Sequence, residues 1–178
     1  MDYCEEILRE VPDLHNDYRN MICTNYNRFI KMKVDQGISL YRLRDNLVDP
    51  REMAQRYTCY SQLYMIYGKK SLKHVPKRIK EVIEKGYLSK NLYRTKMNVF
   101  IFKATLLLFF GIAFIVASAA FIIGSIGNLS PVVIFFSLFV MGAGAMLIQQ
   151  VFDSRYRVYN DLIDNAMTGC KINSFEKE

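Results

Sequence analysis

An uncharged run of about 49 residues, between Lys103 and Asp153, constrains the fold of this chain more than any other feature. It contains no Asp, Glu, Lys, Arg or His and consists mostly of aliphatic, aromatic and small residues. Helices of water-soluble domains keep a polar face toward solvent, whereas an apolar run of this length is typical of membrane-spanning segments. The sequence therefore predicts an integral membrane protein.

The run is too long for a single crossing, because about 20 helical residues span a bilayer core about 30 Å thick. Residues 126–130 contain Gly, Asn and Ser and are followed by Pro131, a pattern typical of a turn before a new helix. We expect two transmembrane helices, about 104–125 and about 131–152, joined by this turn. In such a hairpin, both ends of the chain lie on the same side of the membrane.

Small residues recur along both predicted crossings, and several are spaced four residues apart. This spacing places them on one helix face, where another helix backbone can approach closely. Packing of the two crossings against each other is the simpler interpretation of these faces, and a docking face for a neighbouring subunit is the functional one, and the two are compatible. The predicted helix-packing residues are Gly111, Ala113, Ala117, Ala120, Gly124, Gly142 and Gly144.

The formal net charge of +7 is concentrated in one segment, since residues 69–103 hold eleven Lys and Arg against two Asp and Glu. Within it, residues 71–96 predict a basic amphipathic helix that begins at Pro76 and ends at Gly86. Such a helix next to a crossing usually lies on the membrane surface and contacts anionic phospholipid. The predicted headgroup contacts are Lys77, Arg78, Lys80, Lys85, Lys90, Arg94, Lys96, Arg155 and Arg157.

Basic residues flank both crossings, whereas the turn between them carries none. The positive-inside rule therefore places both termini in the cytosol, or in the matrix for a mitochondrial protein. We expect the mitochondrial inner membrane rather than a bacterial or other membrane, because a basic helix before a crossing can act as an internal import signal. The acidic, amphipathic first 17 residues resemble neither a secretory signal nor a cleavable presequence.

Residues 1–70 predict a polar region of several short helices, and residues 153–178 predict a helical extension of the second crossing followed by a tail. In the polar region, four tyrosines recur at helical spacing and share one face. Packing inside the chain is the simpler interpretation of this face, and contact with another protein is the functional one. The predicted partner interface comprises Tyr57, Tyr60, Tyr64 and Tyr67.

The four cysteines are widely separated and lack metal-ligand spacing. We expect plain thiols if both ends share a reducing compartment, while a Cys4–Cys23 or Cys23–Cys59 bridge between neighbouring helices stays open. The sequence contains no recognised motif for catalysis, nucleotide binding or nucleic-acid binding. We therefore expect no enzymatic activity, no cofactor, no metal, no small-molecule substrate and no nucleic acid.

These observations predict an all-α membrane protein that acts as a non-catalytic accessory subunit of a large membrane complex. A mitochondrial inner-membrane complex of the respiratory-chain or ATP-synthase type is the favoured assembly, with other complex subunits and anionic phospholipid as partners. The alternative is a membrane-inserting hairpin effector, or a membrane-shaping protein that oligomerises in a bilayer. Migration in a large assembly of different subunits distinguishes the first hypothesis from the second.

Overall fold

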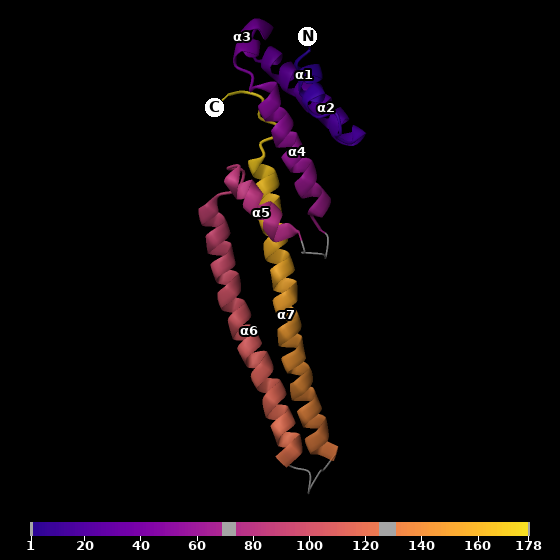
Figure 1. The fold of residues 1–178 in the computed structure, drawn as a ribbon, viewed down its shortest axis with the longest axis vertical. Helices are drawn as coiled ribbons and strands as arrows, with labels where there is room; N and C mark the ends of the chain where they lie inside the picture. Colours follow the sequence, from indigo (N-terminus) through magenta and orange to yellow (C-terminus); the bar gives the residue numbers. More distant parts are fainter. Residues whose placement is uncertain (1, 69–73, 125–130, 178) are drawn as a thin grey trace. The chain divides into compact units, whose positions relative to one another are not determined.

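The computed structural model describes residues 2–68, 74–124 and 131–177, and it confirms an all-helical chain with two long apolar helices that could span a membrane (Figure 1). No strand occurs among these residues, which contain only an isolated antiparallel bridge between Leu47 and Glu176. The predicted turn at 126–130 and the predicted basic helix before His74 lie outside the described residues. The helices are α1 (Tyr3–Glu10), α2 (Asn16–Asp35), α3 (Leu40–Asp45), α4 (Pro50–Ile66), α5 (Val75–Glu84), α6 (Lys90–Gly124) and α7 (Pro131–Gly169).

The chain divides into two compact units. We call Met1–Leu88 together with Ile163–Glu178 the terminal domain, and Ser89–Leu162 the hairpin. The terminal domain thus combines α1 to α5 with the last residues of α7 and the C-terminal tail. The hairpin contains α6 and the preceding part of α7.

Local sequence sets the helix boundaries of the terminal domain. The side chains of Asp2, Ser39 and Asp49 each accept a hydrogen bond from a backbone N–H at the start of α1, α3 and α4. Such N-caps satisfy donors that have no partner inside the helix. Pro50 occupies the first turn of α4, where its missing N–H costs nothing.

The core of the terminal domain is built from large aliphatic side chains. Ile7 of α1, Ile22 of α2 and Met53 of α4 are fully buried. The apolar face of α5, formed by Val75 and Ile79 with their neighbours, is also buried, and α5 contacts α4. The apolar face of α5 is therefore turned into the terminal domain, and the charged face that carries the predicted headgroup contacts is the one left at the surface.

The C-terminal tail is held against the first helices by an aromatic cluster. The ring of Phe175 is fully buried and lies 5.7 Å from Tyr26 and 5.3 Å from Phe29, measured between ring centroids. Backbone hydrogen bonds run alongside, from Val48 N to Phe175 O at 2.8 Å and from Lys177 N to Asn46 O at 2.9 Å. The tail is thus an integral part of the domain.

A disulfide joins Cys4 of α1 to Cys23 of α2, whose Cα atoms lie 5.8 Å apart. This corrects the expectation of four plain thiols and selects one of the two bridges that the sequence left open. The bond forms because α1 and α2 pack against each other and bring the two side chains together. Cys59 and Cys170 carry free thiols and are both buried.

The end of α7 approaches the chain just before α6 at a glycine. A Cβ atom on Gly169 would fall on the carbonyl group of Tyr87. Only glycine allows the two backbones to come this close. This contact fixes the C-terminal end of α7 within the terminal domain.

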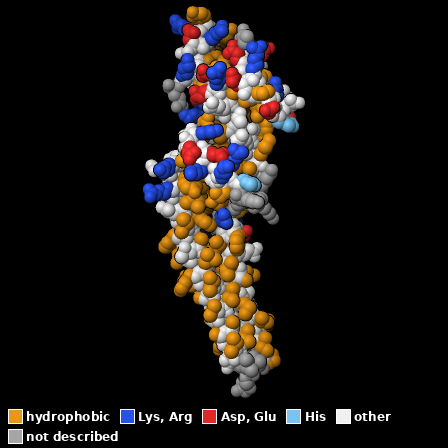
Figure 2. Space-filling view, viewed as in Figure 1, with side chains coloured by type: hydrophobic (Ala, Val, Ile, Leu, Met, Phe, Trp, Pro, Cys, Tyr) orange, Lys and Arg blue, Asp and Glu red, His pale blue; other side chains and the backbone are white. Residues whose placement is uncertain are grey.

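In the apolar part of the hairpin, 104–124 and 131–152, the buried residues are all small. Ala104, Gly111 and Ser118 of α6 are buried at seven-residue intervals, and Ser137 of α7 is also buried. A Cβ atom on Gly144 of α7 would lie 2.7 Å from the Gly111 carbonyl oxygen, so the two helices are in backbone contact there. Hydrophobic side chains cover the outer surface of both helices (Figure 2).

Candidate functional site

The predicted helix-packing residues fall into an inner and an outer group. Gly111 and Gly144 belong to the contact between α6 and α7, because a Cβ atom on either would lie closer than 3.0 Å to atoms of the other helix. Gly142 has open space around it, with nothing within 4 Å of an added Cβ. The inner contact therefore uses Gly111 and Gly144 but not Gly142.

The outer group lies on α6 and is exposed. At 100° per residue, its members cluster about 180° around the helix from Gly111. They form a stripe of small side chains that α7 does not cover. We call this the outer stripe, and its members are Ala113, Ala117, Ala120 and Gly124.

Bulky exposed residues flank the outer stripe. Val116 and Ile123 follow one edge, at 60% and 66% exposure. Phe114 and Phe121 follow the other, at 40% and 54%. A row of small side chains between two rows of large ones has a shape that can receive the surface of another helix.

The structure separates the four tyrosines of the predicted partner interface. Tyr57 is fully buried, and its hydroxyl donates a hydrogen bond to the Ile172 carbonyl at 2.9 Å. It is therefore a core residue and no part of the surface. Tyr60 is half-buried, whereas Tyr64 and Tyr67 are exposed.

Tyr18 of α2 joins the surface tyrosines, which sequence spacing within one helix could not reveal. Its ring meets that of Tyr64 edge to face, with centroids 6.3 Å apart, and Tyr60 stacks on Tyr64 at the same separation. Partial burial raises the pKa of the Tyr18 hydroxyl, and Tyr64 and Tyr60 add to this effect. We call Tyr18, Tyr60, Tyr64 and Tyr67 the tyrosine surface.

The predicted headgroup residues lie in both units. Lys77 and Lys80 of α5 are exposed, as is Lys85 just after it, and Arg78 is half-buried with an ion pair to Glu81 at 2.8 Å. Their helix therefore offers lipid a charged face only.

In the hairpin, Lys90, Arg94 and Arg157 are exposed. Lys96 pairs with Asp161 at 2.7 Å, and the Arg155 guanidinium lies 5.8 Å from the centre of the Tyr159 ring. The Lys96–Asp161 pair joins α6 to α7, whereas Arg155 and Tyr159 both lie on α7.

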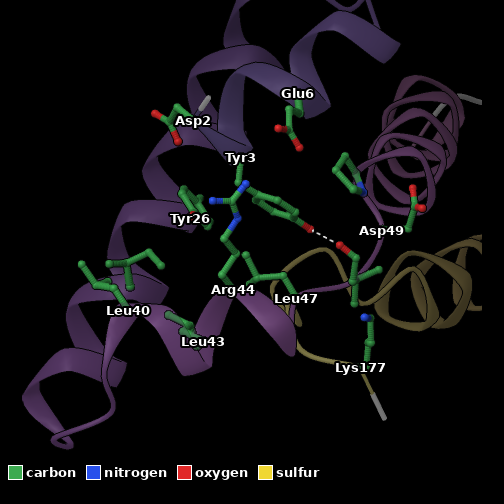
Figure 3. Close-up of a pocket in the computed structure, with 13 residues that line it drawn as sticks. Asp2, Tyr3, Glu6, Tyr26, Leu40, Leu43, Arg44, Leu47, Asp49 and Lys177 are labelled. Carbon is green, nitrogen blue, oxygen red and sulfur yellow. Dashed lines mark hydrogen bonds between the residues drawn. The ribbon is translucent and has the colours of Figure 1, made fainter.

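A groove of about 540 Å³ lies in the terminal domain between α1, α2, α3 and the start of α4 (Figure 3). The Tyr3 hydroxyl donates a hydrogen bond across it to the Val48 carbonyl at 2.7 Å. Burial raises the pKa of this hydroxyl, which favours the neutral form that donates the hydrogen bond. Asp2, Glu6 and Arg44 give the groove charges of both signs.

A second hollow, of about 660 Å³, lies between α2 and the C-terminal tail. The ammonium group of Lys33 is 2.6 Å from a carboxylate oxygen of Glu176 at its edge, so this cation is already neutralised. In the parts of the chain that the structure describes, no group of three or more His, Cys, Asp or Glu could hold a metal ion.

The features that the geometry singles out are thus two surfaces, the outer stripe and the tyrosine surface. Comparisons of this chain with protein-family models, with curated proteins and with solved structures find no match.

Proposed function

We propose that this chain is a non-catalytic accessory subunit of a membrane protein complex, anchored by the hairpin. The observation that carries the proposal is the outer stripe of α6. One small-residue face of α6 is occupied by α7, and a second face of the same kind is unoccupied.

In a bilayer, apolar side chains gain nothing by leaving lipid, so helices associate through close packing rather than through the hydrophobic effect. Small side chains allow that packing because they let two backbones approach. A lone hairpin needs one such face, which Gly111 and Gly144 provide. The outer stripe supports a contact with a transmembrane helix of a different subunit.

The tyrosine surface supports a second contact outside the membrane. Tyr64 and Tyr67 are 56% and 45% exposed, and Met65 between them is 55% exposed. Exposed aromatic and Met side chains are enriched in protein interfaces, where they bury large areas at low entropic cost. We propose that this surface packs on a polar domain of the same complex.

The positive-inside rule supports an orientation with both termini on the cytosolic or matrix face, as the exposed Lys90, Arg94 and Arg157 border the membrane helices. The Cys4–Cys23 disulfide is more typical of an oxidising compartment, so it counts against this orientation, whereas the distribution of Lys and Arg counts for it. We propose the positive-inside orientation, and in a mitochondrion this is the matrix face of the inner membrane. Protease protection of a C-terminal tag in sealed membranes tests this orientation directly.

The subunit proposal is tested by the size of the native particle. A C-terminally tagged protein is solubilised in mild detergent and analysed by native electrophoresis with mass spectrometry of the co-migrating proteins. We expect a discrete assembly of several different subunits. Migration alone or as a homo-oligomer would contradict the proposal and favour a hairpin that acts on the bilayer by itself.

The role of the outer stripe is tested in the same assay. Ala117→Leu and Ala120→Leu add bulk to the stripe without touching the contact between α6 and α7. We expect both variants to leave the assembly, whereas Ala145→Leu, the same substitution at an exposed position of α7, stays in it. If all three variants remain in the assembly, the outer stripe is not the interface.

A further inference from the structure

The packing of α5 fixes which of its side chains reach the surface. Its apolar side chains Val75, Ile79 and Val82 are 1%, 1% and 4% exposed, and α5 contacts α4. At 100° per residue, Lys77 and Lys80 lie toward the opposite side of the helix, and both are exposed. The face that α5 presents outside the terminal domain is therefore charged. We call Lys77, Lys80 and the C-cap residue Lys85 the α5 lysines.

Little of the charge on the α5 lysines is neutralised by the protein itself. In the part of the chain that the structure describes, no carboxylate lies within 4.0 Å of Lys77 or Lys85. Lys80 lies 4.0 Å from Glu84, with 80% and 66% of the two side chains exposed. An ion pair this long and this exposed contributes little. The three ammonium groups are thus free to bind an external anion.

The segment around α5 carries the positive charge of the whole chain. Residues 69–103 hold eleven Lys and Arg against two Asp and Glu, whereas the rest of the chain holds thirteen against fifteen. In the sequence, α5 ends at Glu84 and α6, which is apolar enough to span a membrane, begins at Lys90. Basic side chains close to a membrane helix attract the anionic lipids of that membrane.

The composition of this surface favours lipid over protein as its ligand. Of the large hydrophobic side chains that the described residues leave exposed, none lies on α5. Protein interfaces depend on aromatic or other large anchors at their centre, and Tyr64, Met65 and Tyr67 of α4 are of that kind. A layer of headgroups needs no such anchor, because each flexible lysine binds it as a point charge.

We propose that the α5 lysines bind the anionic phospholipid headgroups of the bilayer that the hairpin spans. The contact is purely electrostatic, since Val75 and Ile79 are buried in the domain and cannot insert into lipid. It therefore strengthens with the fraction of anionic lipid and weakens with salt. This inference rests on the proposed membrane anchor, but not on the outer stripe or the tyrosine surface.

The test compares the full-length protein in nanodiscs of pure phosphatidylcholine and in nanodiscs that also contain anionic phosphatidylglycerol. Lysines are acylated briefly, and the rate at each one is measured by mass spectrometry. We expect the α5 lysines to react about threefold more slowly in the anionic nanodiscs, and high salt to abolish this difference. Lys31 of α2, which is also exposed, is the control and should react equally in both.

Equal rates at the α5 lysines in the two kinds of nanodisc would overturn the proposal, as would an equal slowing at Lys31. Incorporation into nanodiscs tests the membrane anchor separately, so a failure of the anchor is distinguished from a failure of lipid binding. An acidic protein surface is the other possible ligand. Protection of the α5 lysines in the native assembly, but not in anionic nanodiscs, would assign them to a protein and overturn the proposal.

Matched triple substitutions test whether position or net charge matters. One variant changes all three α5 lysines to Gln, and the control carries Arg28→Gln, Lys31→Gln and Arg42→Gln, at exposed positions of α2 and α3. Native mass spectrometry in detergent measures the affinity of each for added phosphatidylglycerol. We expect the α5 variant to bind about tenfold more weakly, and the control to bind as the unsubstituted protein does. Equal losses, or no loss in the α5 variant, would overturn the proposal.

Discussion

The terminal domain and the hairpin use side-chain size in opposite ways. In the terminal domain, large side chains such as Ile22, Met53 and Phe175 are buried. In the apolar part of the hairpin, 104–124 and 131–152, the buried positions include Ala104 and Gly111, while large side chains such as Phe109 and Phe139 are exposed. One chain therefore contains two packing patterns.

This difference is the one expected between a domain in water and a helical hairpin in lipid. In water, burying a large apolar side chain is favourable by about 1.5–3 kcal/mol, so the large apolar side chains form the core. In lipid that gain vanishes, and close backbone contact becomes the main source of stability. α7 contains both patterns, with Gly144 in helix contact in the hairpin and Ile163 buried in the terminal domain.

The largest expected effect comes from the tail. Phe175→Ala removes a fully buried ring from the aromatic cluster with Tyr26 and Phe29. We expect the free energy of unfolding of the terminal domain to fall by about 3–5 kcal/mol, through lost burial and the cavity left behind. Denaturant titration of the full-length protein in detergent, followed by near-ultraviolet circular dichroism, measures this loss.

The matched control is Phe102→Ala in the hairpin, where the ring is 69% exposed. This substitution should change the same unfolding transition by less than about 0.5 kcal/mol. A comparable loss from both variants would mean that Phe102 is covered by protein, and the contrast between the two units would be lost.

A methyl group added to Gly144 tests the hairpin. Its Cβ would lie 2.7 Å from the Gly111 carbonyl oxygen and 2.9 Å from the side chain of Ile115, so α6 and α7 must move apart. We expect Gly144→Ala to weaken the helix pair by about 1–3 kcal/mol, measured by unfolding in mixed detergent micelles.

Gly142→Ala is the control for this substitution, because open space surrounds an added Cβ there. We expect no loss, and a gain of up to about 1 kcal/mol from better helix propensity. Equal destabilisation by both variants would argue that the small residues matter through flexibility rather than through contact.

Removing the hydroxyl of Tyr57 is expected to lower the free energy of unfolding by a smaller amount. It donates a hydrogen bond to the Ile172 carbonyl at 2.9 Å and accepts one from Asn25 at 3.4 Å. Tyr57→Phe leaves the buried carbonyl without this donor, so we expect a loss of about 1–2 kcal/mol in the free energy of unfolding. Tyr64→Phe, at an exposed ring, should have no measurable effect on the same transition.

The same hydroxyl predicts a pH dependence. Burial raises the pKa of Tyr57 from its ordinary value of 10.0 to about 12. The stabilisation by the neutral hydroxyl is therefore complete below about pH 10 and disappears as the pH rises through about 12. The difference in unfolding free energy between the unsubstituted protein and Tyr57→Phe should shrink across this window and stay constant below it.

Much of the fold could be predicted from sequence because its signals are local. The uncharged run between Lys103 and Asp153 determines the two long apolar helices. The Gly, Asn and Ser residues before Pro131 predicted the start of a second helix there, and α7 begins at Pro131. Caps and glycines specify such boundaries without reference to the rest of the chain.

The parts that could not be predicted depend on contacts between distant segments. The amphipathic pattern of α5 is the same for a helix on a membrane and for one packed on α4. Likewise, helical spacing grouped Tyr57 with Tyr64, but only the fold shows that the tail covers Tyr57 through Ile172. The packing of Tyr18 on Tyr64 also leaves no signal in local sequence.

The smallest expected effect separates a partly buried ion pair from an exposed one. Lys33 lies 2.6 Å from Glu176 with 16% of its side chain exposed, whereas Lys80 lies 4.0 Å from Glu84 with 80% exposed. We expect Lys33→Gln to lower the free energy of unfolding by about 0.5–1 kcal/mol, and Lys80→Gln by about 0.3 kcal/mol or less. Raising the salt concentration should reduce both effects, and that of Lys80 first, because solvent ions screen exposed charges more strongly. Equal losses at low salt would show that the pair with Glu176 does not hold the tail, and that the aromatic cluster around Phe175 does so alone.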